Sequence, residues 1–337
     1  MAYHDGDALA STYAAAREGG YGFFASNVTH FDVLLGLLDG AERVGSDLVV
    51  QLSRESAAFY GCGDPDVGLD AFGAYLERVA AGADVGVACN VDHVHLPDQW
   101  EFLDAVVESD VPSSVMVDAS DRSFEENVDL VRDATARLHA ADPDVLVEAE
   151  LGRVAGTEGS TETALEDAYY TDPEASVEFV ERTGVDLLAV SVGTQHGVAS
   201  GVDLDVRPDI AREVDAALRE AGHDVPLVVH GASGLADEQV RAFVDAGVRK
   251  FNKNTRYQYE FSRTLADFYR EHADAVRPPE GVADDREGFF ADADWAPDRT
   301  YFHPHAATDR VHERLADVYA DLAELTGSAG QSRGSER

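Results

Sequence analysis

Lysine is almost absent from this chain of 337 residues, in which Lys250 and Lys253 are the only two lysines. The 26 lysine and arginine residues face 65 aspartate and glutamate residues, and the formal net charge is -39. A surface this acidic repels the phosphates of nucleic acids and of anionic membranes, so we expect neither as a partner. Because such charge destabilises a compact state unless salt screens it, the composition is typical of a halophilic protein.

Cysteine and long apolar segments are scarce as well. Cys62 and Cys89 are too few for a disulfide framework and lack the CxxC spacing of a zinc or redox motif. No apolar run approaches the roughly 20 residues that span a bilayer, and the first ten residues show no secretory leader pattern. We therefore expect a cytoplasmic protein without a membrane segment.

Short apolar runs of strand length recur along the chain and alternate with segments of helical periodicity. The clearest helical segment begins at Ser123, where SFEE forms a capping box. Eight apolar runs cover residues 22–27, 47–53, 85–92, 113–119, 145–151, 185–193, 226–230 and 248–254. This alternation predicts an α/β fold, the (β/α)8 TIM barrel.

Further segments are expected before, between and after the eight strands. A helix is expected over residues 5–18, and a C-terminal helical extension over 306–326. We expect one catalytic domain over 1–326 and, from its small polar composition, a flexible tail over 327–337. The long connections 152–173 and 272–305 are expected to cover a site or form a subunit contact.

Three histidines stand at or just past the ends of apolar runs: His93, His196 and His230. In a TIM barrel the carboxyl ends of the strands meet at the catalytic face, so the three imidazoles are expected to converge there. Three protein ligands with one open position are typical of catalytic zinc, although iron, manganese and cobalt accept the same donors. The pattern predicts a metal-dependent enzyme.

Buried carboxylates near these histidines are further candidates. Glu150 lies on an apolar strand and needs a partner, which could be the metal, an alternative metal position or an arginine. Glu148 shares that strand face and competes with Glu150 for the role. Asp92 precedes His93, so the two point to opposite faces unless the strand has already ended. Lys250 shares a strand side with Asn252 and Asn254 and is a candidate for neutralising a phosphate.

The chain resembles the class II metal-dependent fructose-1,6-bisphosphate aldolases, from about residue 27 to residue 256. The resemblance rests on the order and spacing of short motifs: QLS at 51–53, Asp-His at 92–93, VDAS at 117–120, EAELG at 148–152, Gly-Thr-Glu at 156–158, HG at 196–197, HGASG at 230–234 and NKNT at 252–255. The chain departs from the family's pattern in two places. It has no lysine three or four residues beyond His196, where the family commonly has one, and Ser53-Arg54 stands where the family has Ser-Gly.

This resemblance implies roles for individual residues. His93, His196 and His230 would hold the metal. Asp92 would exchange the proton of the C4 hydroxyl, and Glu158, eight residues beyond Glu150, would act from a mobile loop. Substrate contacts are implied at Asn27, Ser53, Gly197, Gly231, Ser233, Asn252, Asn254 and Thr255.

The implied reaction is the reversible cleavage of fructose 1,6-bisphosphate into dihydroxyacetone phosphate and glyceraldehyde 3-phosphate. The implied cofactor is a divalent metal, zinc before Mn²⁺, Fe²⁺ or Co²⁺, and a monovalent cation is left open. A homodimer or homotetramer is expected. Tagatose-1,6-bisphosphate aldolase is the alternative within the family. A metal-dependent TIM-barrel hydrolase and a Schiff-base aldolase that uses Lys250 or Lys253 are alternatives outside it.

Overall fold

The computed structural model describes residues 3–158, 161–163, 169–197, 205–282 and 295–334; within 155–163 it describes the backbone alone. Eight parallel strands close into a barrel in the order β1-β11-β10-β8-β5-β4-β3-β2. They are β1 (Phe23–Asn27), β2 (Leu48–Ser53), β3 (Val87–His95), β4 (Ser114–Asp118), β5 (Leu146–Leu151), β8 (Leu187–Val190), β10 (Leu227–Val229) and β11 (Val248–Lys253). The predicted TIM barrel is confirmed.

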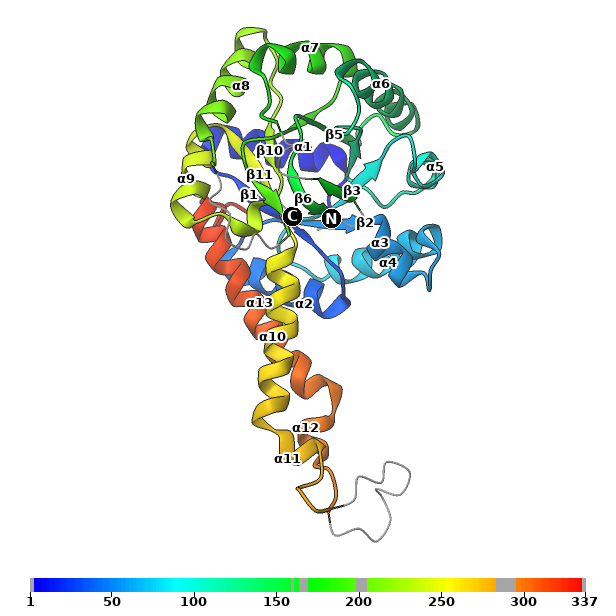
Figure 1. The fold of residues 1–337 in the computed structure, drawn as a ribbon, viewed down its shortest axis with the longest axis vertical. Helices are drawn as coiled ribbons and strands as arrows, with labels where there is room; N and C mark the ends of the chain where they lie inside the picture. Colours follow the sequence, from blue (N-terminus) through cyan, green and yellow to red (C-terminus); the bar gives the residue numbers. More distant parts are fainter. Residues whose placement is uncertain (1–2, 159–160, 164–168, 198–204, 283–294, 335–337) are drawn as a thin grey trace.

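Helices surround this barrel and connect successive strands, as Figure 1 shows. They begin where the sequence provides caps: Ser123 and Glu126 form the expected capping box of α6, and Asp172 caps α7. The connecting helices are α2 (Phe31–Val44), α3 (Arg54–Tyr60), α4 (Pro65–Ala80), α5 (Trp100–Glu108), α6 (Phe124–Ala141), α7 (Pro173–Thr183), α8 (Pro208–Glu220) and α9 (Asp237–Asp245).

The N-terminal helix α1 (Gly6–Gly19) closes the end of the barrel where the strands begin. Its buried residues Leu9, Tyr13 and Ala16 form one apolar cluster with side chains of the barrel interior, among them Ala25 and Val228. That end is filled with apolar side chains, so the opposite, carboxyl-terminal end is left for chemistry.

The C-terminal helix α13 (Pro304–Thr326) packs closely against α2 because two glycines of α2 leave room for it. A Cβ atom at Gly40 would lie 2.6 Å from the carbonyl oxygen of Ala316, and one at Gly36 would lie 2.8 Å from the Cβ of Leu315. Helix α13 begins two residues before the start expected from the sequence and ends where expected.

The segment after α13 differs from the flexible tail that we expected. Gly330 and Ser332 donate their amides to the carbonyls of Val44 and Gly45, both over 2.8 Å. The hydroxyl of Ser332 donates to Asp47 over 2.6 Å. This segment consists mainly of small polar residues, and hydrogen bonds hold it against Val44, Gly45 and Asp47. The structure thus describes residues 327–334 as a segment docked against the barrel, and residues 335–337 lie outside the described residues.

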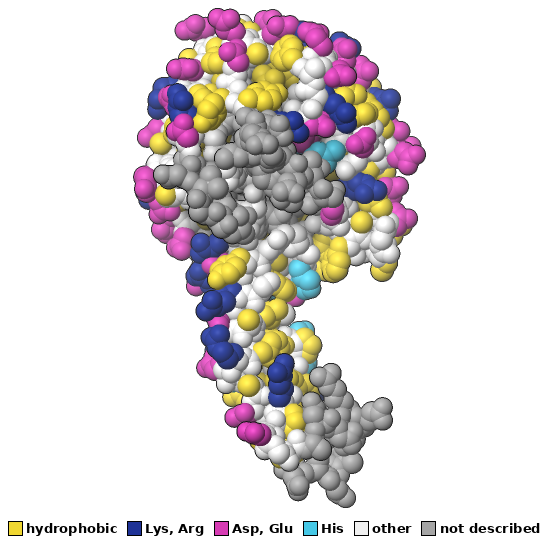
Figure 2. Space-filling view, viewed as in Figure 1, with side chains coloured by type: hydrophobic (Ala, Val, Ile, Leu, Met, Phe, Trp, Pro, Cys, Tyr) yellow, Lys and Arg dark blue, Asp and Glu magenta, His cyan; other side chains and the backbone are white. Residues whose placement is uncertain are grey.

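An arm extends away from the barrel at the lower end of Figure 1. It consists of α10 (Thr255–Glu271), α11 (Ala273–Val276), α12 (Arg299–Phe302) and the first part of α13. Apolar side chains are exposed along it in Figure 2, while acidic side chains dominate the outline of the barrel. Tyr259 and Tyr269 of α10 are 58% and 39% exposed. None of the helices in the described ranges is long and apolar enough to cross a membrane.

Candidate metal centre

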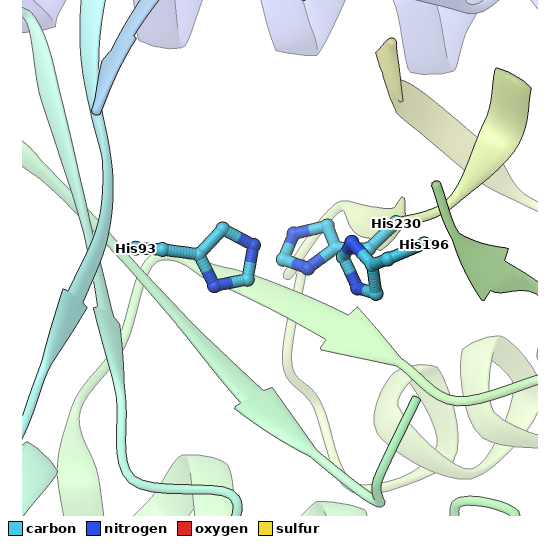
Figure 3. A group of neighbouring side chains, drawn as sticks. All are labelled: His93, His196 and His230. Atoms are coloured by element: carbon cyan, nitrogen blue, oxygen red, sulfur yellow. The ribbon is translucent and has the colours of Figure 1, made fainter. Parts of the chain in front are cut away.

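Three imidazole rings converge at the carboxyl-terminal end of the barrel (Figure 3). The ring centroids of His93 and His230 lie 4.7 Å apart, and that of His196 lies 5.6 Å from His93 and 6.0 Å from His230. One nitrogen from each ring lies within 4.8 Å of the others. The structure therefore brings together the three histidines that the sequence singled out.

His93 and the preceding Asp92 lie at an irregularity in β3. The register between β3 and β4 shifts between Val91 and Val94, and His93 has a φ angle of 50°, in the left-handed region. A bulge of this kind breaks the alternation of side chains between the two faces of a strand. Asp92 and His93 consequently both line the same pocket, which uninterrupted strand geometry would forbid.

The ring of His93 is oriented by Asp118, the last residue of β4. Nδ1 of His93 donates to Oδ2 of Asp118 over 3.1 Å, and Nδ1 of His95 lies 3.3 Å from the same oxygen. Burial alone would raise the pKa of Asp118, but the hydrogen bonds from the two histidines hold it well below its usual range. The bond to Asp118 occupies Nδ1, so Nε2 is the nitrogen that His93 would present to a metal ion.

His230 lies between two glutamates of β5, with a carboxylate at each ring nitrogen. Nε2 donates to Glu148 over 2.9 Å, and Nδ1 lies 2.9 Å from Oε2 of Glu150. Burial lowers the pKa of His230, but the adjacent carboxylates of Glu148 and Glu150 outweigh it and raise the pKa to about 9. Without a metal, the ring is therefore held as a cation between the two carboxylates.

Lys250 does not occupy the phosphate-binding position for which it was a candidate. Its side chain is fully buried inside the barrel, and Nζ lies 2.5 Å from Oε2 of Glu148. Coulombic attraction to Lys250, together with the bond from His230, overcomes the burial of Glu148 and lowers its pKa to about 2. The interior thus contains a chain of charged groups from Lys250 through Glu148 to His230.

His196 does not lie on a barrel strand as the sequence suggested, because β8 ends at Val190. It belongs to β9 (Gln195–His196), which joins a small sheet with β6 (Ala155–Glu158) and β7 (Thr161–Thr163). Gly156 pairs with His196 in this sheet. The strand that ends at Glu158 therefore runs beside a ring of the histidine cluster, although the side chain of Glu158 lies outside what the structure describes.

Asp92 is 1% exposed and is surrounded by side-chain amides. Asn27 of β1 and Gln51 of β2 each donate to its carboxylate over 2.8 Å, and Asn252 of β11 donates over 3.3 Å. Neutral donors from three strands orient the carboxylate without forming a salt bridge. Asn27 and Asn252, which the resemblance assigned to the substrate, are thus also partners of Asp92.

A pocket above the histidines contains most of the substrate-binding candidates. Its lining residues are Asn27, Asp92, His93, His196, Gly197, Gly231, Ser233, Asn252, Asn254 and Thr255. Gly231 has a φ of 65°, and a Cβ atom there would lie 2.5 Å from the carbonyl oxygen of Gln195. Only glycine fits this turn, and Gly231 and Ser233 of the turn both line the pocket.

An adjoining cavity of about 520 Å³ extends from His93 and Gly197 towards α3. It includes Ser53, whose hydroxyl accepts a hydrogen bond from the amide of Ser56 and caps α3. The two spaces together could accommodate a ligand longer than a single triose.

The donor set fits a divalent cation. Nδ1 of His230 and Oε2 of Glu150 are buried, and although they lie 2.9 Å apart, neither has a hydrogen bond of acceptable geometry. Burying two such atoms without a hydrogen bond is costly, and a cation would satisfy both. Glu150 does not belong to the group of His93, His196 and His230, whose nitrogens could share one ion. The structure shows Glu150 instead as a neighbour of His230.

Sequence reasoning missed Gln51 and Asp118 as contributors to the site. Both lie within motifs that were recognised, QLS and VDAS. Each is a buried polar residue on an apolar strand, which is a signal that the side chain has a partner.

Residues 7–331 match the model of the family described as fructose-bisphosphate aldolase class-II. The chain is 33% identical, over 267 residues, to the D-tagatose-1,6-bisphosphate aldolase subunit GatY of Klebsiella oxytoca, covering 78% of this chain and 86% of that protein.

Solved structures show the same fold. The fructose-bisphosphate aldolase of Campylobacter jejuni has a TM-score of 0.80 at 24% identity, covering 98% of this chain and 97% of that one. The YdjI aldolase of Escherichia coli K12 has a TM-score of 0.69 at 25% identity, covering 96% and 98%.

Proposed function

Because this chain belongs to the class-II fructose-bisphosphate aldolase family and is therefore a carbon–carbon lyase, we propose that it reversibly cleaves fructose 1,6-bisphosphate. The products would be dihydroxyacetone phosphate and glyceraldehyde 3-phosphate. The observation that carries this proposal is that Asp92 lines one pocket with His93 and His196, whose nitrogens lie within 4.8 Å of one another and of a nitrogen of His230. Family membership and this pocket together favour an aldolase over a metal-dependent hydrolase.

We assign the metal to His93 through Nε2, His230 through Nδ1, and His196. Asp118 and Glu148 hold the remaining nitrogens of His93 and His230, so each carboxylate fixes which nitrogen is presented. When bound, the divalent cation supplies Lewis-acid polarisation of the ketose carbonyl. Zinc is the expected metal, since three imidazoles and an open position suit it.

In this proposal Asp92 removes the proton of the C4 hydroxyl as the C3–C4 bond breaks. Its three amide donors orient the carboxylate but do not neutralise its charge, which suits a general base. Glu158 then protonates the carbanion and releases dihydroxyacetone phosphate. The pairing of β6 with β9 supports this role, because it brings the backbone near Glu158 alongside His196.

We propose that the phosphate of the dihydroxyacetone half binds at Gly197, Gly231, Ser233, Asn252, Asn254 and Thr255. All six line the pocket above the histidines. The other half of the substrate would extend into the cavity that contains Ser53. The similarity to a protein named as a tagatose-bisphosphate aldolase subunit keeps D-tagatose 1,6-bisphosphate as the second candidate substrate.

One experiment addresses metal, reaction and substrate. The protein is purified in high salt, its metal content is measured by elemental analysis, and triose-phosphate release is assayed with fructose and tagatose bisphosphates. We expect about one divalent ion per active site and turnover that EDTA abolishes. Borohydride treatment with substrate should leave the protein unmodified, because Lys250 is ion-paired inside the barrel and Lys253 is directed away from the pocket. A trapped lysine adduct would refute the metal route.

Variants test the residue assignments. Asp92→Ala and Glu158→Ala should retain metal and lose at least about a hundredfold in turnover, because each removes a proton-transfer group. Asp98→Ala is the matched control, since Asp98 is 80% exposed and lies soon after the strand that carries Asp92. Full activity of Asp92→Ala would exclude it as the base.

We also propose a homo-oligomer, a dimer or a tetramer. The arm formed by α10 to α13 exposes Tyr259 and Tyr269, which a second copy of the chain could cover. Light scattering in high salt measures the mass directly, and a monomer at working concentration would contradict this part of the proposal.

A further inference from the structure

Lys253 is a buried cation that forms no ion pair with the carboxylates of the described residues. It ends β11 on the outer side of the barrel and is 5% exposed. Nζ donates to the carbonyl oxygen of Ala232 over 3.0 Å and lies 4.6 Å from the centre of the Phe24 ring. Among the residues that the structure describes, no carboxylate lies within 4.0 Å of it. Asp237 and Arg256 line the same outer pocket, and their opposite charges act on the ammonium in opposite directions.

Burying an ammonium group without an ion-pair partner lowers the free energy of unfolding. The presence of Lys253 at this position therefore implies a role that needs its charge. Burial is the main cause that lowers the pKa of Lys253 to about 8. An unbranched apolar side chain at this position could pack against Phe24, Val240 and Val318 without the free-energy cost of burying a charge. The chain has only two lysines, and this one lies where packing alone does not favour a lysine.

The acceptor of Lys253 belongs to the turn that forms one side of the substrate pocket. Ala232 lies between Gly231 and Ser233, and both of these neighbours line that pocket. Ser233 and Lys253 also line a second pocket of about 520 Å³ on the outer side, between α9 and α13. Lys253 therefore lies directly behind the turn, on the side away from the histidines.

We propose that Lys253 is a positioning residue for phosphate recognition. By holding the carbonyl of Ala232 on the outer side, it fixes the peptide planes of the turn so that amides of Gly231–Ser233 face the pocket. Its positive charge lies behind these amides and attracts the same anion. This inference rests on the proposed function, because it assumes that the turn receives the phosphate of the substrate.

The test compares three variants with the wild type. Lys253→Met keeps the length of the side chain and removes the charge and the donor, and Lys253→Arg restores both. Arg241→Met is the matched control, because Arg241 is an exposed cation that lines the same outer pocket. Each protein is assayed in the condensation direction with dihydroxyacetone phosphate and with dihydroxyacetone, and binding of inorganic phosphate is measured by calorimetry.

For Lys253→Met we expect KM for dihydroxyacetone phosphate and Kd for inorganic phosphate to rise about tenfold, the loss of one charge-assisted interaction. Activity with dihydroxyacetone should stay unchanged, because this substrate has no phosphate. Lys253→Arg should recover most of the loss, and Arg241→Met should behave as the wild type. The thermal midpoint of Lys253→Met should equal or exceed that of the wild type, whereas a merely structural lysine would lower it.

Two results would overturn the inference: unchanged phosphate binding in Lys253→Met, or an equal loss with both donor substrates. The phosphate titration also separates this inference from the proposed function. A wild type without aldolase activity refutes the proposed function, while its calorimetric comparison with Lys253→Met still decides whether Lys253 supports anion binding.

Discussion

The buried pair of Lys250 and Glu148 offers the sharpest test of the reasoning about the barrel interior. Both side chains are fully buried, and Nζ lies 2.5 Å from the carboxylate. Removing one partner of such a pair leaves an uncompensated charge and typically costs about 3–5 kcal/mol. We expect this loss in the free energy of unfolding for Lys250→Met, and a similar loss for Glu148→Gln.

The double variant should be more stable than either single variant. Once both charges are gone, the glutamine oxygen can still accept the hydrogen bond from His230. The unsatisfied amide N–H is the remaining cost, about 1–3 kcal/mol. The double-mutant cycle should therefore give a coupling energy of at least about 3 kcal/mol.

Equilibrium urea unfolding of the metal-free proteins in high salt, followed by circular dichroism, measures all four stabilities. Chelation before the measurement removes the contribution of metal binding to the folded state. Single-variant losses below about 1 kcal/mol would contradict the reasoning, since that is the range of exposed pairs. Strictly additive losses would show that the two groups do not compensate each other.

Three further predictions concern protons, salt and phosphate. His230, with a pKa of about 9 in the metal-free protein, is protonated at neutral pH and must lose its proton to bind a metal. Calorimetric zinc titrations in buffers of different ionisation enthalpy should therefore show proton release, and apparent affinity should rise with pH up to about 9; no release would contradict the assigned geometry. The net charge of -39 predicts that the thermal midpoint rises steadily between about 0.1 M and about 2 M KCl as repulsion is screened; a flat profile would argue against a salt-adapted surface. The pKa of Lys253, lowered by burial to about 8, predicts that the Kd for inorganic phosphate increases from about pH 7 to about pH 9 as the ammonium loses its proton. This increase should be absent in Lys253→Met.

Much of the architecture could be read from the sequence because the signals are local. Apolar runs bounded by capping residues mark the eight strands, and closure of the barrel follows from their number and alternation. The convergence of His93 and His230 was predictable for the same reason, since the ends of parallel strands meet at one face, whereas His196 joins them from β9, outside the barrel.

The details of the site depend on contacts that the sequence does not reveal. The bulge that turns both Asp92 and His93 into the pocket has no glycine or proline to mark it. Lys250 and Glu148 lie on β11 and β5, which are not neighbours in the barrel, so their pairing depends on the register of the intervening strands. The composition of residues 327–334 suggested a flexible tail, because hydrogen bonds to Asp47 and the adjacent backbone leave no trace in composition.

That docked C-terminal segment brings Gly334 close to His4, and these residues lie near the two limits of the described chain. The amide of His4 donates to the carbonyl of Val87 over 2.8 Å, and Gly334 lies against the backbone of Val85 and Gly86. A short engineered linker between the termini should therefore span little distance. Circular permutants opened at an exposed loop away from the carboxyl-terminal end of the barrel should retain the histidine cluster. A fusion partner joined beyond His4 or Gly334 would begin at the end of the barrel opposite the catalytic face.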